Sequence, residues 1–574
     1  MPTLDVSGFN IVIAVLGGWI SLFGLVSYLL KEKFYLSEAL ISLLAGVGFS
    51  THGANFIRPV EYALFDELNL EKITLNFTRL VLGVQVLLAG VQLPSRYLKT
   101  EWKSLALLLG PIMVAMWLAT SLLVWALVPN LPFLHALAIG ACVTPTDPVL
   151  SNVIVKGRFA DHNIPKDLQK IIIAESGAND GLGYPFLFFA LYLIKYTGDG
   201  GRAESGGAAA AMGLWFGEMW GYTIILSVVY GAAVGWLAKE LLHYAEARNW
   251  VDRESFLVYA ISLSLFTVGT CGMMGSDDIL ACFVAGNVFT WDDWFRLETL
   301  DDSLQPTIDM LLNVTIFMWY GAVCPWQIFS VNGVIPLYRL VALSILILLF
   351  RRMPFIFGLH KFIHQIELAS QAIFMGFFGP IGCSAMFYLY ITLEFVEGLK
   401  KRERHDVDNL NEAVRVIVWF MLVSSVAIHG LSIPLGKFGL YLPRTLSGTT
   451  TGDEDEPIFR IRGISTALPQ ALSLGRFRTG TRASTSHDSA LVASRSFHTS
   501  YGSISPRKDA TDMLSQMGVP PTKSHTPGTS SPADSRADQS TETLQNLSPP
   551  ALINQTLRFH DESTPSPRGP STEL

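Results

Sequence analysis

Charged residues are scarce in this sequence. Asp, Glu, Lys and Arg together make up 16% of the 574 residues, whereas 50% of the residues are hydrophobic. About a quarter of the residues in a soluble domain are charged, so this composition excludes an ordinary soluble protein. It is typical of a chain that crosses a membrane many times. The net charge of −7 gives no reason to expect a nucleic-acid partner.

Several sequence patterns that carry chemistry are also absent. No Gly-rich loop ends in Gly-Lys-Ser or Gly-Lys-Thr, so we do not expect ATP to drive the protein directly. The Gly-x-Ser-Gly and Gly-x-Gly-Asp patterns of the two common intramembrane proteases are missing, which argues against an intramembrane enzyme. The five cysteines form no close pair of the kind that binds zinc. We therefore expect a protein that is not an enzyme and needs no cofactor.

Long apolar runs are missing from the C-terminal part of the chain. Residues 444–574 are rich in Ser, Thr, Pro, Gly and Arg and show no sustained apolar periodicity. Such a segment buries too little apolar surface to offset the entropy lost on ordering, which predicts a disordered tail. The sequence thus divides into a transmembrane domain at residues 1–443 and a tail at residues 444–574. We place the function in the first domain, because an anchor would need far fewer spans.

The apolar runs of the first domain predict an all-α fold of twelve or thirteen transmembrane helices. The second and ninth runs are short for a hydrocarbon core about 30 Å thick, which leaves the two counts open. The predicted spans are residues 9–30, 36–50, 73–93, 104–128, 134–155, 168–195, 212–238, 255–274, 278–291, 304–326, 334–358, 370–396 and 412–433.

The Lys and Arg residues between these spans predict the orientation. If the N-terminus lies outside, sixteen of these residues lie in or near the inner loops and eight in or near the outer loops. Because positive charge favours the cytoplasmic side, we expect an outer N-terminus and a cytoplasmic tail. The basic run at residues 400–404 lies on the disfavoured side.

The sixth span contains the densest polar cluster at membrane depth. Residues 174–183 read Ala-Glu-Ser-Gly-Ala-Asn-Asp-Gly-Leu-Gly, with apolar runs on both sides. A charge at the centre of a bilayer costs about 2.5–3.5 kcal/mol even on insertion scales, so such residues are usually functional. A polar contact between helices is the alternative. The clustering favours a binding site, in the segment that holds Asn179 and Asp180.

The fifth span is interrupted by two prolines, Pro145 and Pro148. A helix cannot run unbroken through both, because each proline removes a backbone donor. Unwound backbone at membrane depth is tolerated only inside the protein or beside a wet cavity. Thr144, Thr146 and Asp147 supply oxygen atoms beside this break, which suits a hard monovalent cation. The alternative is a structural kink whose polar groups are satisfied by neighbours.

The twelfth span has a similar interruption around Pro380, within residues 376–384. The fifth and twelfth spans are equivalent if the first six are repeated, inverted, as the last six. Interrupted spans at matching positions of two halves are the best sequence indication of a transporter's central site. The carboxylate of Asp147 would then also compensate the positive helix ends that meet at the crossing.

Two of these motifs carry a family resemblance. Thr-Pro-Thr-Asp-Pro at residues 144–148, followed by Glu-Ser-Gly-Ala-Asn-Asp-Gly at residues 175–181, resembles the Asn-Asp branch of the monovalent cation:proton antiporter superfamily. The acidic segment at residues 277–287 and the tail look most like fungal plasma-membrane Na⁺/H⁺ antiporters. The resemblance covers approximately residues 10–440, and the two motifs together are specific.

The resemblance implies a homodimer in which each subunit has a dimer domain and a core domain. The core would hold two crossed, broken helices and move as an elevator-like body. It implies that Asp180 binds the metal cation and the proton in turn, and that Asn179 replaces a second Asp of electrogenic relatives. It also implies a structural ion pair between Glu175 and an Arg of the eleventh span, for which we choose Arg352, with Arg351 as the alternative.

Two further groups have more than one interpretation. Asp277 and Asp278 could gather cations at the outer mouth, but a solvated loop is the simpler interpretation. His429, in the last span, resembles a family pattern, and a helix-packing role is favoured over proton transfer.

With these features, the resemblance implies a plasma-membrane antiporter that exchanges cytosolic Na⁺ or Li⁺ for external H⁺ in salt tolerance and pH homeostasis. Asp180 would hold the metal cation with help from Asn179, Asp147, Thr144 and Thr146. K⁺ stays open as a substrate, because selectivity depends on cavity size and ligand number. A channel or uniporter without proton coupling is the alternative. Serine sites in the tail are candidate targets for regulatory kinases.

Overall fold

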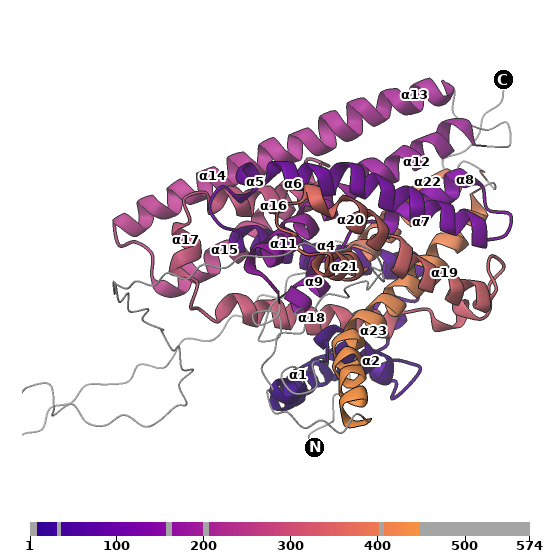
Figure 1. Cartoon of the computed structure of the whole chain (residues 1–574), viewed down its shortest axis with the longest axis horizontal. Coiled ribbons are helices and arrows are strands. Elements are labelled where there is room, and N and C mark those ends of the chain that lie inside the picture. Colours follow the sequence, from indigo (N-terminus) through magenta and orange to yellow (C-terminus); the bar gives the residue numbers. More distant parts are fainter. Residues whose placement is uncertain are drawn as a thin grey trace, which may run out of the picture. The chain divides into compact units, whose positions relative to one another are not determined.

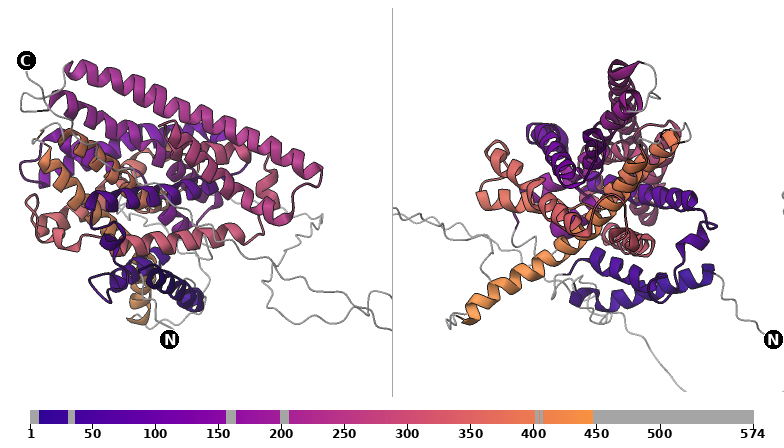
Figure 2. Two further views of the ribbon diagram at one scale, coloured as in Figure 1. Left: turned by 180° about the vertical axis from the view of Figure 1, so that it is seen from behind. Right: turned by 90° about the vertical axis from the view of Figure 1, so that its right-hand side faces the viewer.

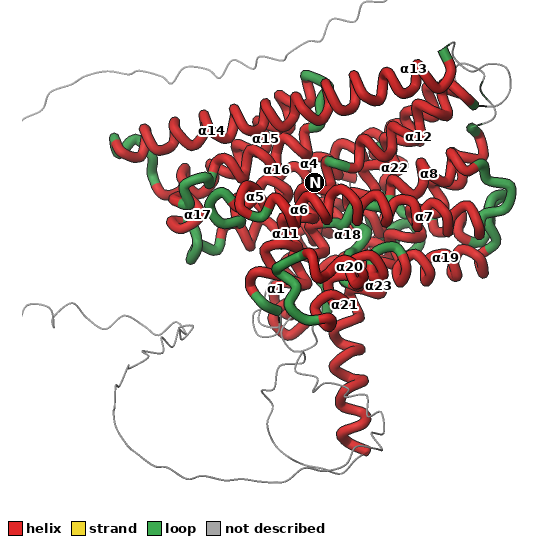
Figure 3. The backbone as a smooth tube through the Cα atoms, turned by 45° about the horizontal axis from the view of Figure 1, so that its top comes forward, coloured by secondary structure: helices red, strands yellow, loops and turns green. Residues whose placement is uncertain are grey.

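The computed structural model describes residues 8–30, 36–155, 164–198, 206–400, 404 and 407–446. These residues form helices and connecting loops with no strand, so the all-α prediction is confirmed for this part of the chain (Figures 1 and 3). The last helix runs to Leu446, slightly beyond the predicted domain boundary. The predicted disordered tail lies, from residue 447 onward, outside the described residues.

The first half of the chain contains both continuous and interrupted spans. Their bounds are α1 Gly8–Tyr28, α2 Glu38–Phe49, α3 Pro59–Tyr62, α4 Glu67–Gln92, α5 Tyr97–Thr100, α6 Trp102–Leu107, η2 Leu108–Ile112, α7 Met113–Leu127, α8 Phe133–Cys142, α9 Pro148–Val155, α11 Lys166–Gly181, α12 Gly183–Thr197, α13 Gly207–Leu214, η3 Trp215–Ile225 and α14 Leu226–Ala247. Of these, η2 and η3 are π-helical.

The second half follows the same pattern. Its bounds are α15 Arg253–Met273, α16 Asp278–Phe289, α17 Trp294–Glu298, α18 Leu304–Val323, η4 Trp326–Phe329, α19 Leu337–Phe350, α20 Met353–Leu359, η5 His360–Phe362, α21 Ala369–Phe377, α22 Cys383–Lys400 and α23 Asp408–Leu446.

Each of the thirteen predicted spans coincides with one helix or with consecutive helices. Within the described residues, seven helical stretches are long and apolar enough to cross a membrane by themselves. The second and ninth spans are the twelve-residue helices α2 and α16, as short as the sequence predicts. The fifth and twelfth spans are interrupted, between α8 and α9 and between α21 and α22.

Two spans that the sequence predicts as unbroken are also interrupted. The sixth divides at Leu182, between α11 and α12, because glycines on both sides leave the backbone without helix-favouring neighbours. The eleventh divides at Arg351 and Arg352, between α19 and α20. That second break turns two adjacent arginines toward the protein interior, where both side chains are buried.

The helices pack around two main apolar cores. The smaller core joins α4, α14, α15 and α16 through residues such as Leu88, Phe256 and Phe289. The larger core surrounds the interrupted helices and includes α7, α8, α11, α12, α22 and α23. The continuous helical stretch α13, η3 and α14 packs on α12 at its start and on α16 at its end, so it connects both cores (Figures 1 and 2).

Candidate functional site

The two interrupted spans cross where their helices end. Helix α8 ends at Cys142 and α21 ends at Phe377, while α9 begins at Pro148 and α22 at Cys383. The backbone N–H of Asp147 donates to the carbonyl oxygen of Pro380 at 3.0 Å, which joins the two breaks directly. Four half-helix ends therefore meet inside the larger core.

Asp147 lies at the two N-terminal ends of this crossing. One carboxylate oxygen accepts a hydrogen bond from the backbone N–H of Leu150 at 2.8 Å, and the other accepts one from Ser384 at 3.3 Å. The side chain is fully buried. Helix N-termini carry partial positive charge, so a carboxylate in this place is electrostatically favourable. A methyl group added to Gly382 would lie 2.5 Å from Cγ of Asp147, which explains the need for glycine beside it.

Arg351 compensates the opposite, C-terminal ends. Its guanidinium donates to the carbonyl oxygens of Val143, of Thr144 at 3.2 Å and of Pro145 at 3.3 Å, just past α8. It also donates to the carbonyl oxygen of Gly379, just past α21. The last carbonyls of a helix lack partners and carry partial negative charge, so a buried guanidinium stabilises them. Sequence reasoning considered Arg351 only as an alternative partner for Glu175. The carbonyls freed by the prolines were the signal for this second role.

Glu175 and Arg352 are brought together as the resemblance implies. Nη1 of Arg352 lies 2.8 Å from Oε1 of Glu175, and Nη2 lies 2.7 Å from Oε2, in a bidentate pair. Nε of Arg352 donates to the carbonyl oxygen of Met375 at 3.0 Å. Both partners are buried. The pair links α11 to the break between α19 and α20, and the bond to Met375 extends this link to α21.

Breaking this pair should destabilise the fold, because either single change strands a buried charge. We expect Glu175→Ala or Arg352→Ala to cost about 3–5 kcal/mol of unfolding free energy, measured by thermal unfolding of the purified protein. The double variant should lose less than the sum of the two losses. Additive losses would show that the two residues are not coupled. The half-exposed pair Arg58 and Glu61 is the matched control, for which little change is expected.

Asn179 is held by the backbone and side chain of Thr146. Its amide nitrogen donates to Oγ1 of Thr146 at 2.8 Å, and its amide oxygen accepts from the backbone N–H of Thr146 at 3.2 Å. Oγ of Ser176, which sequence reasoning missed, lies 3.2 Å from Oγ1 of Thr146. Thr144 turns away, since its hydroxyl donates to the carbonyl oxygen of Gly140 at 2.7 Å. These contacts fix α11 against the break between α8 and α9.

Asp180 differs from every other charged group at the crossing. It is buried, and neither of its carboxylate oxygens forms a hydrogen bond with any described residue. The hydroxyl of Ser384, also missed from the sequence, faces the Asp180 carboxylate and is placed to donate to it, although neither group forms a hydrogen bond of regular geometry within the described residues. The backbone carbonyl of Asp180 accepts a hydrogen bond from the hydroxyl of Tyr388. Buried polar groups are almost always satisfied, so this carboxylate, with Ser384 beside it, is open to a proton or a cation as a further ligand.

Asp277 and Asp278 do not lie in a solvated loop, so that interpretation is wrong. Both are buried at the start of α16, where Oδ1 of Asp277 accepts backbone hydrogen bonds from Ile279 and Leu280 at 3.1 and 3.0 Å. Asp278 pairs with Arg79 of α4 at 2.5 Å. The reason is capping, because the first backbone donors of a buried helix need acceptors.

The second carboxylate oxygen of Asp277 faces the main site. A methyl group added to Gly181 would lie 2.9 Å from Oδ2 of Asp277, so this side chain lies against the residue that follows Asp180. That oxygen has no hydrogen-bond partner within the described part of the chain. A role for this pair in cation access stays a prediction.

His429 packs at the end of α21. Its Nε2 lies 3.1 Å from the carbonyl oxygen of Phe377, and its Nδ1 lies 2.9 Å from that of Ser425. Contact with the last residue of α21 agrees with the helix-packing interpretation. A role in proton transfer gains no support from this geometry.

Comparison with known proteins places this arrangement among ion exchangers. Residues 19–435 match the family described as "Sodium/hydrogen exchanger, transmembrane". The Na(+)/H(+) antiporter 2 of Zygosaccharomyces rouxii is 33% identical over 461 residues, which cover 78% of this chain and 55% of the relative. A Na(+)/H(+) antiporter of Schizosaccharomyces pombe is 31% identical over 466 residues, which cover 79% of this chain and 96% of the relative.

A third relative and a solved structure agree with these matches. The Na(+)/H(+) antiporter of Saccharomyces cerevisiae is 34% identical, over 78% of this chain and 45% of the relative. The chain thus spans about half the length of the Z. rouxii and S. cerevisiae proteins. The sodium proton antiporter of Methanocaldococcus jannaschii at pH 8 has a similar fold, with a TM-score of 0.54 and 15% identity over 75% of this chain and 98% of that one.

The match to the family covers all the elements that form the crossing, and the resemblance to fungal Na⁺/H⁺ antiporters is confirmed. This chain belongs to the sodium/hydrogen exchanger family.

Proposed function

We propose that this protein is a secondary antiporter that exchanges cytosolic Na⁺ or Li⁺ for external H⁺. The observation that carries the proposal is Asp180, a buried carboxylate whose oxygens have no partner within the described residues. The other charged groups at the crossing are hydrogen-bonded or paired, namely Asp147, Glu175, Arg351 and Arg352. One carboxylate is thus left for a transported ion.

The mechanism follows from the competition of two ligands for Asp180. A bound proton or a bound monovalent cation neutralises the carboxylate, so the core can carry it across the apolar barrier. The unloaded carboxylate retains its charge, and moving that charge through hydrocarbon costs about 2.5–3.5 kcal/mol even on insertion scales. This penalty favours exchange over leak.

The predicted site residues have different roles, because some of their polar atoms are already hydrogen-bonded within the protein and others are not. Asp180 and the hydroxyl of Ser384, which face each other, would bind the dehydrated ion directly, because neither forms a regular hydrogen bond within the described residues. Asn179 and Thr146 bind each other and so would position Asp180. Asp147 and Thr144, also predicted from the sequence, would contribute by compensating helix ends and by fixing the end of α8.

A proteoliposome assay tests the exchange. With a preset pH gradient, external Na⁺ or Li⁺ should dissipate the gradient, and K⁺ is tested beside them because selectivity depends on the size of the site. A channel or uniporter would instead carry cation without changing the pH gradient when electrical coupling is prevented. Cation flux with no response of the pH gradient would therefore reject the antiporter in favour of the channel.

The charge balance gives a separate prediction. Only Asp180 changes its ligand, because Glu175 stays paired with Arg352 and Asp147 stays bound to the helix ends. One cation then replaces one proton, and no net charge crosses the membrane. The membrane potential, which contributes about 2.3 kcal/mol per charge per 100 mV, should have no effect on initial rates. The measurement compares rates at two potentials clamped with valinomycin, and a clear voltage dependence would show that a second group, such as Asp147, also exchanges a proton.

The location and assembly are part of the same proposal. The excess of Lys and Arg in alternate loops supports a cytoplasmic tail, and the resemblance to fungal antiporters supports a homodimer in the plasma membrane. Asp277 and Asp278 would attract cations toward the site, on the side where Gly181 lies. The tail would regulate the exchanger through phosphorylation by kinases.

The tail should be dispensable for exchange itself. A chain that ends after Leu446 keeps every helix of the described residues, so we expect its vesicle exchange to match that of the full chain. The measurement is the initial rate of gradient dissipation per reconstituted protein. Complete loss of exchange in a truncated protein that still folds would show that the tail belongs to the transport machinery.

A further inference from the structure

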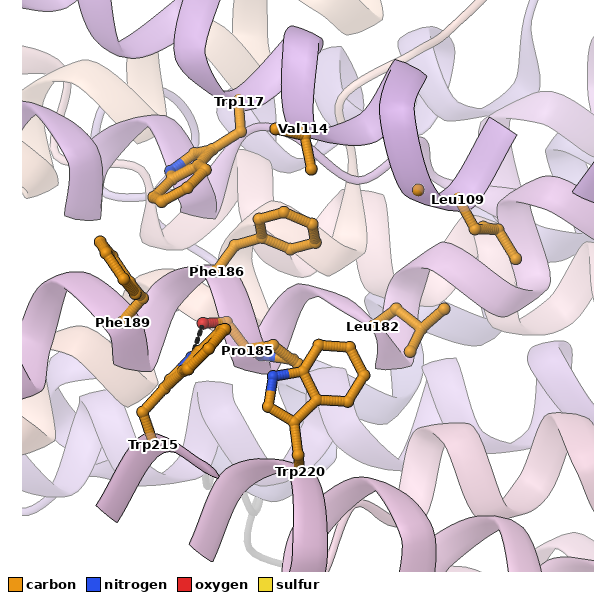
Figure 4. Close-up of a pocket in the computed structure, with 10 residues that line it drawn as sticks. Leu109, Val114, Trp117, Leu182, Pro185, Phe186, Phe189, Trp215 and Trp220 are labelled. Carbon is orange, nitrogen blue, oxygen red and sulfur yellow. Dashed lines mark hydrogen bonds between the residues drawn. The ribbon is translucent and has the colours of Figure 1, made fainter. Parts of the chain in front are cut away.

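A cavity of about 270 Å³ lies beside the helix that follows the ion site. Its walls come from η2 and α7, from the start of α12 and from η3 (Figure 4). Leu182, the residue at the break between α11 and α12, forms part of the lining. The cavity therefore reaches Leu182, which follows Asp180 by two residues in the sequence.

The lining has almost no polar group that could form a hydrogen bond with water. It consists of aliphatic and aromatic side chains with one glycine, and it contains no charged residue. The indole nitrogen of Trp117 donates to the carbonyl oxygen of Leu137 at 2.8 Å, and that of Trp215 donates to Pro185 at 2.7 Å (Figure 4). Apolar cavities of about 150 Å³ stay dry in proteins and take up apolar molecules. An apolar occupant is thus favoured over water.

The rim of the cavity continues into the lipid-facing surface. Val114 and Trp220, at the rim, are 39% and 37% exposed. Leu118 on α7 and Phe216 on η3 are 40% and 63% exposed, on the same two elements. In a multi-pass membrane protein, exposed large apolar side chains on spanning helices face acyl chains. The cavity therefore opens toward the bilayer.

Local helix geometry keeps the space unfilled. Both η2 and η3 are π-helical, a wider form that is rare and occurs frequently at functional sites. Gly110, within η2, contributes no side chain, and a methyl group built on it would meet no atom within 4 Å. The wall thus leaves room that a larger residue at this position would occupy.

We propose that this cavity binds one acyl chain of a membrane phospholipid. The bilayer supplies acyl chains in large excess at the open rim. An acyl chain has no polar groups to pair, so apolar contact with the aromatic lining is sufficient to bind it. The bound chain contacts Leu182 and so supports the break that follows Asp180. This proposal concerns binding, and it stands or falls independently of ion exchange.

The test uses the full chain reconstituted in phosphatidylcholine vesicles that contain a phospholipid with a photoreactive diazirine in its acyl tail. After illumination, labelled residues are located by mass spectrometry. We expect label on the cavity residues of α12 and η3, such as Phe186 and Trp215. Gly110→Phe should fill the cavity and reduce that label roughly tenfold, which corresponds to about 1.4 kcal/mol of binding.

The matched control is Gly217→Phe. Gly217 lies on η3 in equally open space, but it does not line the cavity, so its label should equal that of the unmodified protein. Val114→Trp narrows the rim and should reduce the label as Gly110→Phe does. If Gly110→Phe fails to fold, Val114→Trp provides the test in its place. Unchanged labelling in folded cavity-filling variants would overturn the proposal.

Discussion

Replacing Asp180 with Asn is expected to abolish cation-dependent proton flux while leaving the protein folded and in the membrane. An amide is nearly the same shape as a carboxylate, but it cannot release a proton at any working pH. It also removes the negative charge that holds the cation. Because neither carboxylate oxygen forms a regular hydrogen bond to a described residue, the change removes no strong internal contact. The loss should therefore appear in transport and not in thermal stability.

Asp167→Asn is the matched control for this change. Asp167 lies on the same helix, α11, and its side chain is 77% exposed in a surface pair with Lys170. Exchange in this variant should be close to that of the unmodified protein. Robust cation-dependent proton flux in Asp180→Asn would remove the central role assigned to Asp180.

Replacing Arg351 with Ala is expected to cause a large loss of stability. The guanidinium donates to carbonyl oxygens at the ends of both α8 and α21, and its removal leaves these buried acceptors unpaired. Each buried unsatisfied group costs about 1–3 kcal/mol, so the total loss should be roughly 3 kcal/mol or more. Thermal unfolding of the purified protein measures it.

Arg351→Lys separates charge from geometry. Lysine keeps the positive charge, but a single ammonium group cannot reach both sets of carbonyls as the planar fork does. The stability of the Arg351→Lys variant should fall between that of the unmodified protein and that of Arg351→Ala. Equal stability of all three proteins would show that Arg351 does not hold the crossing together. Arg58→Ala, at a surface position, is the control for loss of an arginine.

Much of this fold was predictable because its signals are local in the sequence. Apolar runs predict the spans, and Pro145, Pro148 and Pro380 predict the two breaks because proline removes helix donors. The contact between Glu175 and Arg352 was predictable from the resemblance, and the structure forms it.

The remaining features depend on contacts between distant segments. Arg351 binds carbonyls more than two hundred residues away, and no local pattern predicts that target. Ser176 and Ser384 reach the site only because α11 and α22 cross the break in α8 and α9. Asp277 is buried because α16 packs against Gly181. In the sequence, the two adjacent carboxylates of Asp277 and Asp278 made a solvated loop the simpler interpretation.

Proton release on cation binding tests the competition at Asp180 most directly. Purified protein in weakly buffered detergent solution, at a pH where Asp180 is protonated, is mixed with Na⁺ or Li⁺ while the pH is recorded. The account predicts release of about one proton for each cation bound, and no release from Asp180→Asn. Cation binding without proton release, or equal release from Asp180→Asn, would contradict the proposal that one carboxylate serves both ions.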